Sequence, residues 1–148
     1  MMKTRVARTL ALAASLAIPV AALNAAEPEE QIKYRQNVMK SIGGHTGAIF
    51  AITGDKAGDD SHLEAHIRSL AATSTIVKDI FPPESELGET RAKAEIWTDA
   101  EGFAEAVKTL EDAAAGVLAA YENGGDLGGA LKDLGGACKG CHDEYRSD

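Results

Sequence analysis

The stretch TDAEGFAEAVKTLEDAAAGVLAAY, residues 98–121, predicts an amphipathic helix and, with it, the type of fold. Its inward positions follow one another at alternating steps of four and three residues: Phe103, Val107, Leu110, Ala114, Val117 and Tyr121. A repeat averaging about 3.5 residues is the seam of helices that pack roughly 20° from parallel. The TDAE sequence at 98–101 has the spacing of a capping box, so we expect this helix to begin there.

Two further segments carry the same seam. Residues 61–81 open with a second capping-box sequence, SHLE, and stop before Pro82. Residues 127–145 follow Asp126, a residue type that caps helix N-termini. The seam positions are Leu63, Ile67, Leu70, Ser74, Val77 and Phe81 in the first segment, and Leu127, Leu131, Leu134, Cys138, Cys141 and Tyr145 in the second. Both segments are therefore expected to be helices of a bundle.

A fourth helix is expected from Pro28, which suits a first-turn position, to about Gly54. Its stripe at the same spacing is Arg35, Met39, Ile42, Thr46, Ile49 and Thr53. Two of these positions are polar where a bundle core prefers apolar side chains. Turns separate the four helices, with a longer loop before residue 98, and no segment alternates like a strand. The pattern predicts an all-α fold, an antiparallel up-down-up-down four-helix bundle over residues 27–148.

Residues 1–26 have the features of a secretory signal peptide. Lys3, Arg5 and Arg8 precede an apolar run, which gives way to small residues before Glu27. The run is short for a membrane span, although an uncleaved anchor is the alternative, and cleavage after Ala22 competes with cleavage next to Ala26. We therefore expect export to a bacterial periplasm.

The exported chain would be strongly acidic. Loss of the three leader cations changes the formal net charge from −8 to −11. Such a charge argues against binding to nucleic acid or to anionic membranes, and it favours a basic protein partner. No second apolar stretch is long enough to span a bilayer, so no membrane span is expected after cleavage.

The only two cysteines lie in the sequence CKGCH at 138–142. Two thiols one helical turn apart can form thioethers with the two vinyl groups of a haem, and the adjoining imidazole of His142 can supply an axial nitrogen to the iron. Zinc would need further ligands, a redox dithiol would need an α/β context, and a disulfide at this spacing would constrain little. The motif predicts one covalently attached haem c, held by Cys138 and Cys141.

Glycines interrupt the same helix at 128, 129, 135, 136 and 140, each costing about 1 kcal/mol relative to alanine in a helix interior. A large rigid ligand lying against the helix backbone would explain them. Chance drift between alanine and glycine is the alternative.

A sixth ligand for the iron would have to come from upstream of His142. Met39 is the only methionine outside the leader, and it shares its stripe with Arg35. Ligation by Met39 and simple packing against the haem remain equally open. Arg35 could pair with a haem propionate, with Gln36 beside it as a hydrogen-bond donor. The other histidines, His45, His62 and His66, are expected to be solvated at the surface.

The chain resembles the class II cytochromes c, which comprise the cytochromes c′ and their low-spin, methionine-ligated relatives. The likeness spans the whole mature chain and is carried by Arg35-Gln36, by ETRAKAEIW at 89–97 and by CKGCHDEYR at 138–146. It implies that Cys138 and Cys141 attach the haem and that His142 is the proximal ligand. It further implies that Arg35 and Gln36 approach the propionates and that Arg91 comes near the haem edge.

The resemblance leaves two functions, which differ in the group opposite His142. Low-spin members use a first-helix methionine as sixth ligand and carry electrons; cytochromes c′ leave that face open to nitric oxide or carbon monoxide. Met39, followed by Gly43 and Gly44, favours a one-electron carrier that exchanges electrons with a redox partner protein, with gas binding as the alternative. Many members dimerise through the first two helices, so a homodimer is a further expectation. Catalysis is not expected, because no histidine lies on the stripe with Met39.

Overall fold

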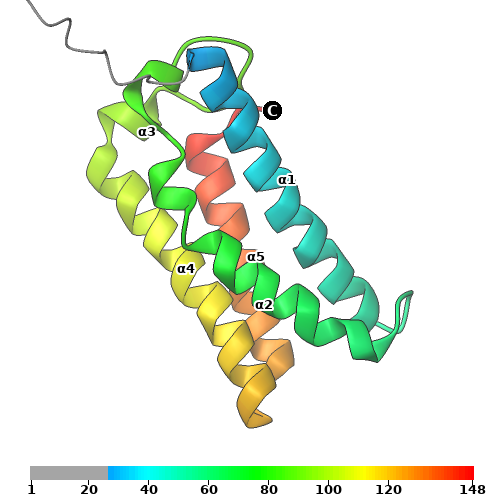
Figure 1. The fold of residues 1–148 in the computed structure, drawn as a ribbon. Coiled ribbons are helices and arrows are strands. Elements are labelled where there is room, and N and C mark those ends of the chain that lie inside the picture. The colour runs from blue at the N-terminus through cyan, green and yellow to red at the C-terminus, as the bar shows by residue number, and fades with distance from the viewer. Residues whose placement is uncertain (1–26) are drawn as a thin grey trace, which may run out of the picture.

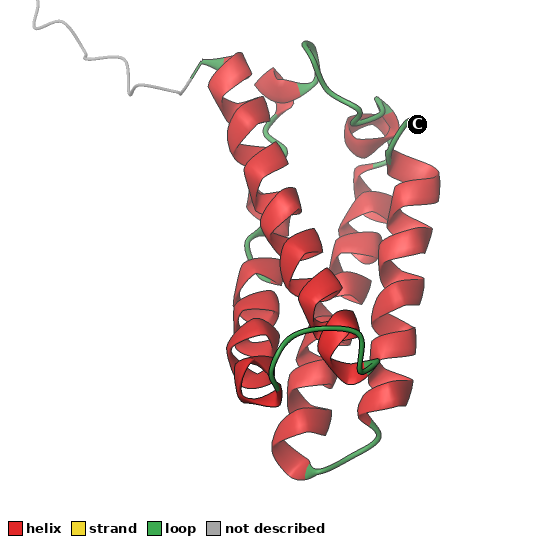
Figure 2. Cartoon of the chain, turned by 90° about the vertical axis from the view of Figure 1, so that its right-hand side faces the viewer, coloured by secondary structure: helices red, strands yellow, loops and turns green. Residues whose placement is uncertain are grey.

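The computed structural model describes residues 27–148, and the predicted signal peptide lies outside the described residues. Helices follow one another along the whole described chain (Figures 1 and 2). They are α1 (Pro28–Thr53), α2 (Leu63–Ser74), the short α3 (Glu95–Thr98), α4 (Ala100–Asn123) and α5 (Leu127–Tyr145), with single 3₁₀ turns at Asp60–His62, Val77–Asp79 and Pro83–Ser85. The predicted all-α four-helix bundle is confirmed, with α1, α2, α4 and α5 as its members.

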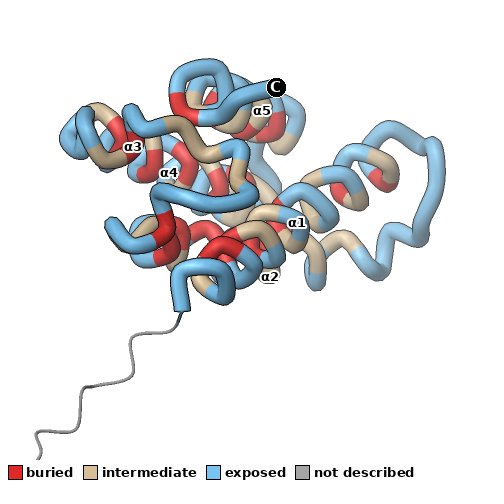
Figure 3. Tube along the Cα trace, turned by 90° about the horizontal axis from the view of Figure 1, so that it is seen from above, coloured by how far each residue is buried: buried red, intermediate tan, exposed pale blue. Residues whose placement is uncertain are grey.

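The helices pack in chain order, but the ring they form is open on one side. α1 packs against α2, α2 against α4, and α4 against α5, whereas the backbones of α1 and α5 hardly approach one another. Buried residues of all four helices belong to one core. Figure 3 marks the buried positions along the chain in red. The fully covered members of the core include Ile49 of α1, Ile67 and Leu70 of α2, Val117 of α4 and Leu134 of α5. The open side between α1 and α5 is where the functional site lies.

The N-terminus of α5 is as predicted, whereas those of α2 and α4 differ in detail. Asp126 caps α5, its carboxylate accepting a hydrogen bond of 2.9 Å from the Gly129 backbone N–H. α4 is capped by Asp99 and not by Thr98, because Thr98 belongs to α3 and its hydroxyl donates to the Ala94 carbonyl. The SHLE sequence forms no capping box.

Before α2, Asp59 takes the capping position of a 3₁₀ turn, its carboxylate accepting a 2.8 Å hydrogen bond from the Ser61 backbone N–H. α2 also ends earlier than predicted, at Ser74. Three consecutive hydroxyl residues close it, and each donates to a carbonyl of the preceding turn: Thr73, Ser74 and Thr75. Such back-bonding competes with the helical hydrogen-bond ladder. Val77 is nevertheless buried in a 3₁₀ turn, so the seam continues past the end of the α-helix.

The buried side of α1 is broader than the predicted stripe. Its buried residues are Ile32, Arg35, Val38, Ile42, Ile49 and Ile52, while Met39 and Thr46 are half-buried and Thr53 is exposed. One flank of the helix packs on α2 and the other flank faces the open side of the bundle. In the described part of the chain, none of the helices has the length and apolarity to cross a membrane.

Candidate functional site

A cavity of about 680 Å³ occupies the open side of the bundle, between α1 and α5. This volume lies within the range of pockets that enclose small molecules and cofactors. The wall on the α5 side contains Ala137, Cys138, Cys141, His142 and Tyr145, and the wall on the α1 side contains Arg35, Met39, Ile42, Gly43, Thr46 and Gly47. The floor is apolar and includes Val77, Phe81, Phe103, Val107 and Leu110. A flat ligand in this space would supply the contacts that α1 and α5 do not make with each other.

The two cysteines meet the cavity from consecutive turns of α5. Cys138 and Cys141 are both free thiols and both half-buried. Burial raises the pKa of each thiol, so both are predominantly neutral near pH 7. No group of three or more His, Cys, Asp or Glu side chains within residues 27–148 is arranged to hold a metal ion, so Cys138 and Cys141 lack the further protein ligands that a structural zinc site at this pair would need.

His142 follows the second thiol and is exposed on the cavity wall. Its Nδ1 lies 3.3 Å from a guanidinium nitrogen of Arg146, one turn further along the chain. A guanidinium at this place adds positive charge beside the imidazole. Two thiols and an imidazole thus lie on one wall of one cavity, as covalent attachment and axial ligation of a haem require.

Arg35 is the most unusual side chain of the opposite wall. Only 3% of its surface is exposed, yet its guanidinium donates hydrogen bonds only to uncharged oxygens. These are Ser85 Oγ at 2.6 Å, the Ser85 carbonyl at 3.2 Å and Thr90 Oγ1 at 2.8 Å. The guanidinium also lies over the Phe81 ring, 4.9 Å from its centroid. Burial lowers the pKa of Arg35, since no carboxylate compensates for the lost hydration.

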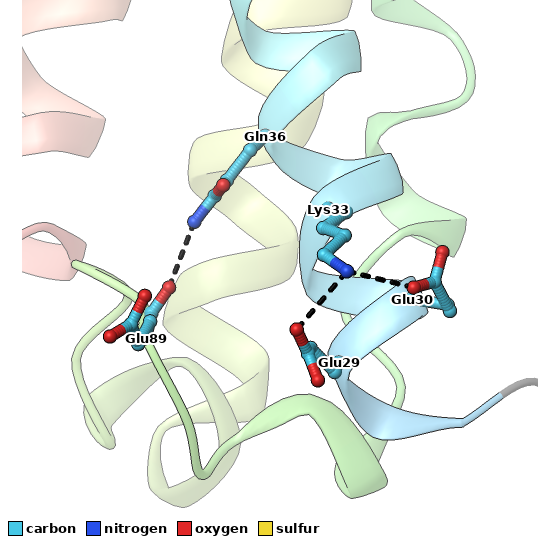
Figure 4. Close-up of polar contacts among 5 residues, drawn as sticks. All are labelled: Glu29, Glu30, Lys33, Gln36 and Glu89. Atoms are coloured by element: carbon cyan, nitrogen blue, oxygen red, sulfur yellow. Dashed lines mark hydrogen bonds and ion pairs between the residues drawn. The ribbon is translucent and has the colours of Figure 1, made fainter.

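A buried cation without an anionic partner, on the wall of a cavity, is suited to receive an anionic group. A haem propionate is such a group, so Arg35 fits the role that the sequence suggested. Gln36 lies next to it, but its side-chain amide donates to the Glu89 carbonyl at 2.9 Å (Figure 4). Gln36 therefore contacts the loop that frames the cavity as well as the cavity itself.

This loop brings Arg91 to the cavity by pairing with the end of α5. Ala92 and Arg146 form an antiparallel bridge, and the Lys93 N–H donates to the Tyr145 carbonyl at 3.0 Å. The Ser147 N–H donates to the Arg91 carbonyl at 2.8 Å. The structure thus places Arg91 on the wall of the cavity and also in a second surface pocket, and His142 lines both.

The glycines of α5 do not have the role suggested from the sequence. None of them lines the cavity, and a Cβ built on Gly135, Gly136 or Gly140 would meet nothing within 4 Å. Gly129 instead lies against the capping carboxylate of Asp126. The glycines that do line the cavity are Gly43 and Gly47 of α1, and they too have open space at the Cβ position.

Two of the three histidines that were expected to be solvated at the surface are only partly exposed. His45 and His66 are half-buried between α1 and α2, with their Nδ1 atoms 3.0 Å apart. His62 is exposed, and none of the three lines the cavity. The sequence spacing of 21 residues between His45 and His66 gave no signal for this pairing.

Sequence reasoning also missed two groups that position the site. Tyr145 is buried, and its hydroxyl donates to the Asp99 carboxylate at 3.0 Å, which ties the last turn of α5 to the start of α4. Ser85 fixes the guanidinium of Arg35. A capping aspartate and an aromatic seam residue were both visible in the sequence, but their contact was not.

The comparisons with known proteins agree with this geometry. The family model described as Cytochrome C' matches residues 30–146. The chain belongs to the cytochrome c′ family. Cytochrome c′ of Pararhodospirillum photometricum is 36% identical over 126 residues, which cover 82% of this chain and 99% of that protein. Cytochrome c′ of Rhodospirillum rubrum is 33% identical over 141 residues, which cover 93% of this chain and 95% of that protein.

Solved structures of the cytochrome c′ family have the same fold. A nitric oxide complex of a cytochrome c prime variant from Alcaligenes xylosoxidans matches with a TM-score of 0.75 and 32% identity, over 83% of this chain and 98% of that one. The predicted resemblance to the class II cytochromes c is confirmed. So is the cofactor: the protein is a c-type cytochrome with covalently attached haem c, and its cysteines, His142 and Arg35 fit that group.

Proposed function

We propose that this protein is a five-coordinate cytochrome c′ of the periplasm that binds nitric oxide or carbon monoxide on the face of the haem opposite His142. The observation that carries the proposal is the wall of α1 across the cavity from His142. There Met39, Ile42, Gly43, Thr46 and Gly47 present neither a base nor a free hydrogen-bond donor, and the exposed Lys40 is the cationic residue of this wall that no other described side chain engages.

Three polar side chains of the cavity, those of Arg35, Gln36 and Thr46, are engaged in hydrogen bonds within the protein. The Thr46 hydroxyl donates to the Ile42 carbonyl of its own helix at 2.8 Å. Arg35 is held by Ser85 and Thr90, and Gln36 by the Glu89 carbonyl. Water and anions gain little at an apolar wall, whereas a neutral diatomic molecule loses almost no hydration on entering. When bound, haem c would supply an iron that can take such a gas as a ligand.

The relatives support the same proposal. Several similar proteins are named cytochrome c′, and one similar structure is a nitric oxide complex of such a protein. From the sequence alone, the first of the two expected functions was electron transfer, with Met39 as the sixth ligand. The comparisons favour gas binding over that expectation.

Electron transfer under Met39 and His142 ligation remains the second candidate function. The specific observation in its favour is that the half-buried Met39 lies on the cavity wall across from His142. Methionine–histidine ligation raises the reduction potential of a haem. We do not expect turnover of a substrate under either function, because His142 is the only described histidine that lines the cavity.

The visible absorption spectrum of the matured holoprotein tests the proposal. We expect a high-spin ferrous spectrum that shifts when carbon monoxide is added, and Met39→Leu should leave this behaviour unchanged. Sharp low-spin ferrous bands that resist carbon monoxide and broaden in Met39→Leu would overturn the proposal in favour of the electron carrier. Recovery of the mature protein from the periplasmic fraction, cut near Glu27, tests the localisation.

A further inference from the structure

His45 of α1 and His66 of α2 form a pair away from the haem cavity. Their Nδ1 atoms are 3.0 Å apart, and their ring centroids are separated by 5.3 Å with the planes tilted by 55°. Both side chains are half-buried, so the pair has access to solvent while the two packed helices fix its position. Neither residue has a role in the haem site described above.

The geometry of the pair is close to that of two ligands on one metal ion. Two imidazole nitrogens bound tetrahedrally to zinc at about 2.0–2.1 Å lie roughly 3.3 Å from each other. A small rotation of either side chain increases the observed 3.0 Å separation to that value. Both Nδ1 lone pairs can then be used at once, whereas a hydrogen bond between neutral rings uses only one of them.

The surroundings of the pair are compatible with a cation. The guanidinium nearest in sequence to His66 belongs to Arg68, and its nitrogens lie 2.8 Å from the carboxylates of Glu64 and Glu122. Both histidine side chains are half-buried and not fully covered, so water molecules can reach the pair and complete a coordination shell. The acidic net charge of the chain attracts cations in general.

We propose that His45 and His66 form a binding site for one divalent transition-metal ion that prefers imidazole, such as Zn²⁺ or Cu²⁺. The ion is held by one Nδ1 from each helix and by water, and it links α1 to α2. Cu²⁺ binds more tightly than Zn²⁺, as the general order of affinities for nitrogen ligands requires. The site is independent of the haem and of the gas-binding proposal.

Isothermal titration of the matured holoprotein with ZnCl₂, together with its thermal unfolding midpoint, tests this site. We expect one zinc ion per chain and a midpoint that rises with zinc but not with the same concentration of Mg²⁺. His45→Ala and His66→Ala should each weaken binding at least tenfold and abolish the zinc-dependent rise. His62→Ala is the matched control, because it removes an exposed histidine next to α2, and it should leave both measurements unchanged.

Several results would overturn the proposal. Absence of zinc binding to the wild-type protein would mean that the pair is only a hydrogen bond. Loss of binding in His62→Ala, with binding retained in His45→Ala, would assign the ion to His62 and His66 on successive turns. The visible spectrum should not change on zinc addition, and this readout separates the test from that of the gas-binding function. It also shows whether each variant has folded around its haem.

Discussion

Arg35 shows how a single residue can serve both the fold and the site. Its guanidinium is almost fully buried, donates to Ser85 and Thr90 in the loop after α2, and lies against the cavity. Burying a charge costs free energy, because the charge loses its hydration, and hydrogen bonds to neutral oxygens compensate for this cost only in part. We propose that a haem propionate provides the missing anion, because the charge of Arg35 lies on the wall of the cavity.

We predict that Arg35→Met destabilises the holoprotein by about 1–3 kcal/mol, because the hydroxyls of Ser85 and Thr90 lose their donor. It should also lower the reduction potential, since a nearby positive charge favours the more negative ferrous state. Arg35→Lys, which keeps the charge but loses the fork-shaped hydrogen bonding, should retain most of the potential and only part of the stability. Urea unfolding and redox titration measure the two effects. An unchanged potential in Arg35→Met would contradict the placement of Arg35 near the haem.

Tyr145 provides a prediction on pH dependence. Burial and then its hydrogen bond to the Asp99 carboxylate raise the pKa of this phenol above its usual value near 10. Because the raised pKa belongs to the folded state, the stabilising contribution is complete below the pKa of the unfolded chain. It is lost as the pH rises through the higher pKa of the folded protein.

We therefore expect one of the three tyrosines to ionise after the others in an ultraviolet titration, and Tyr145→Phe to remove that step. Tyr34→Phe is the control, since Tyr34 is 52% exposed and makes no contact with Asp99, and it should leave the Tyr145 step in place. Asp99→Ala should cost about 1 kcal/mol, because it removes the cap of α4 as well as the partner of Tyr145. A wild-type titration in which all tyrosines ionise together would refute the predicted shift.

At the scale of the helices, local chemistry explains where each element begins and ends. Asp126 and Asp99 cap α5 and α4, and the run Thr73, Ser74 and Thr75 ends α2. The low helix propensity of glycine also makes α5 less stable than the same helix with alanine would be. No packing requires these glycines, because most of them face open space and not a ligand. Their substitution should therefore affect the helix and not the site.

We predict that Gly136→Ala stabilises the holoprotein by about 0.5–1 kcal/mol, since alanine favours the helix and its Cβ meets no atom within 4 Å. Gly129→Ala should have the opposite sign, because its Cβ would come within 2.5 Å of Asp126 Oδ2 and displace the cap. Urea unfolding midpoints decide between these signs. Identical visible spectra of both variants would show that the haem site is undisturbed, and a destabilised Gly136→Ala would argue that the helix lies against something at this position.

At the scale of the whole molecule, each helix of the bundle packs on the next one, but the first helix and the last do not pack on each other. α1 rests on α2, and α4 joins α2 to α5, but the cavity lies where α1 and α5 would otherwise touch. Besides α2, the principal support of α1 is the loop carrying Ser85, which Arg35 and Gln36 hold through hydrogen bonds. A group that fills the cavity therefore completes the core as well as the site.

We predict that the double variant Cys138→Ala/Cys141→Ala, which cannot attach haem, no longer unfolds cooperatively. We also expect the backbone amides of α1 to be the least protected from hydrogen exchange. In hydrogen exchange, amides of α4 and α5 should remain more protected than those of α1, since the α4–α5 pair keeps its own interface without haem. Circular dichroism of the same protein should show reduced helix content. Uniform protection equal to that of the holoprotein would contradict the view that the cofactor completes the core.

The sequence by itself determined the helices, the bundle and the attachment chemistry, because each rests on short-range spacing. Steps of four and three residues make one helix face apolar, and CKGCH brings two thiols and an imidazole together within two turns of α5. Spacing along the chain does not say which distant groups meet. Only the tertiary structure decided that Arg35 is held by Ser85, that Tyr145 reaches Asp99, that His45 faces His66, and that α1 and α5 stay apart. The physical reason is that these contacts join residues far apart in the chain, and only the packing of the helices sets their distances.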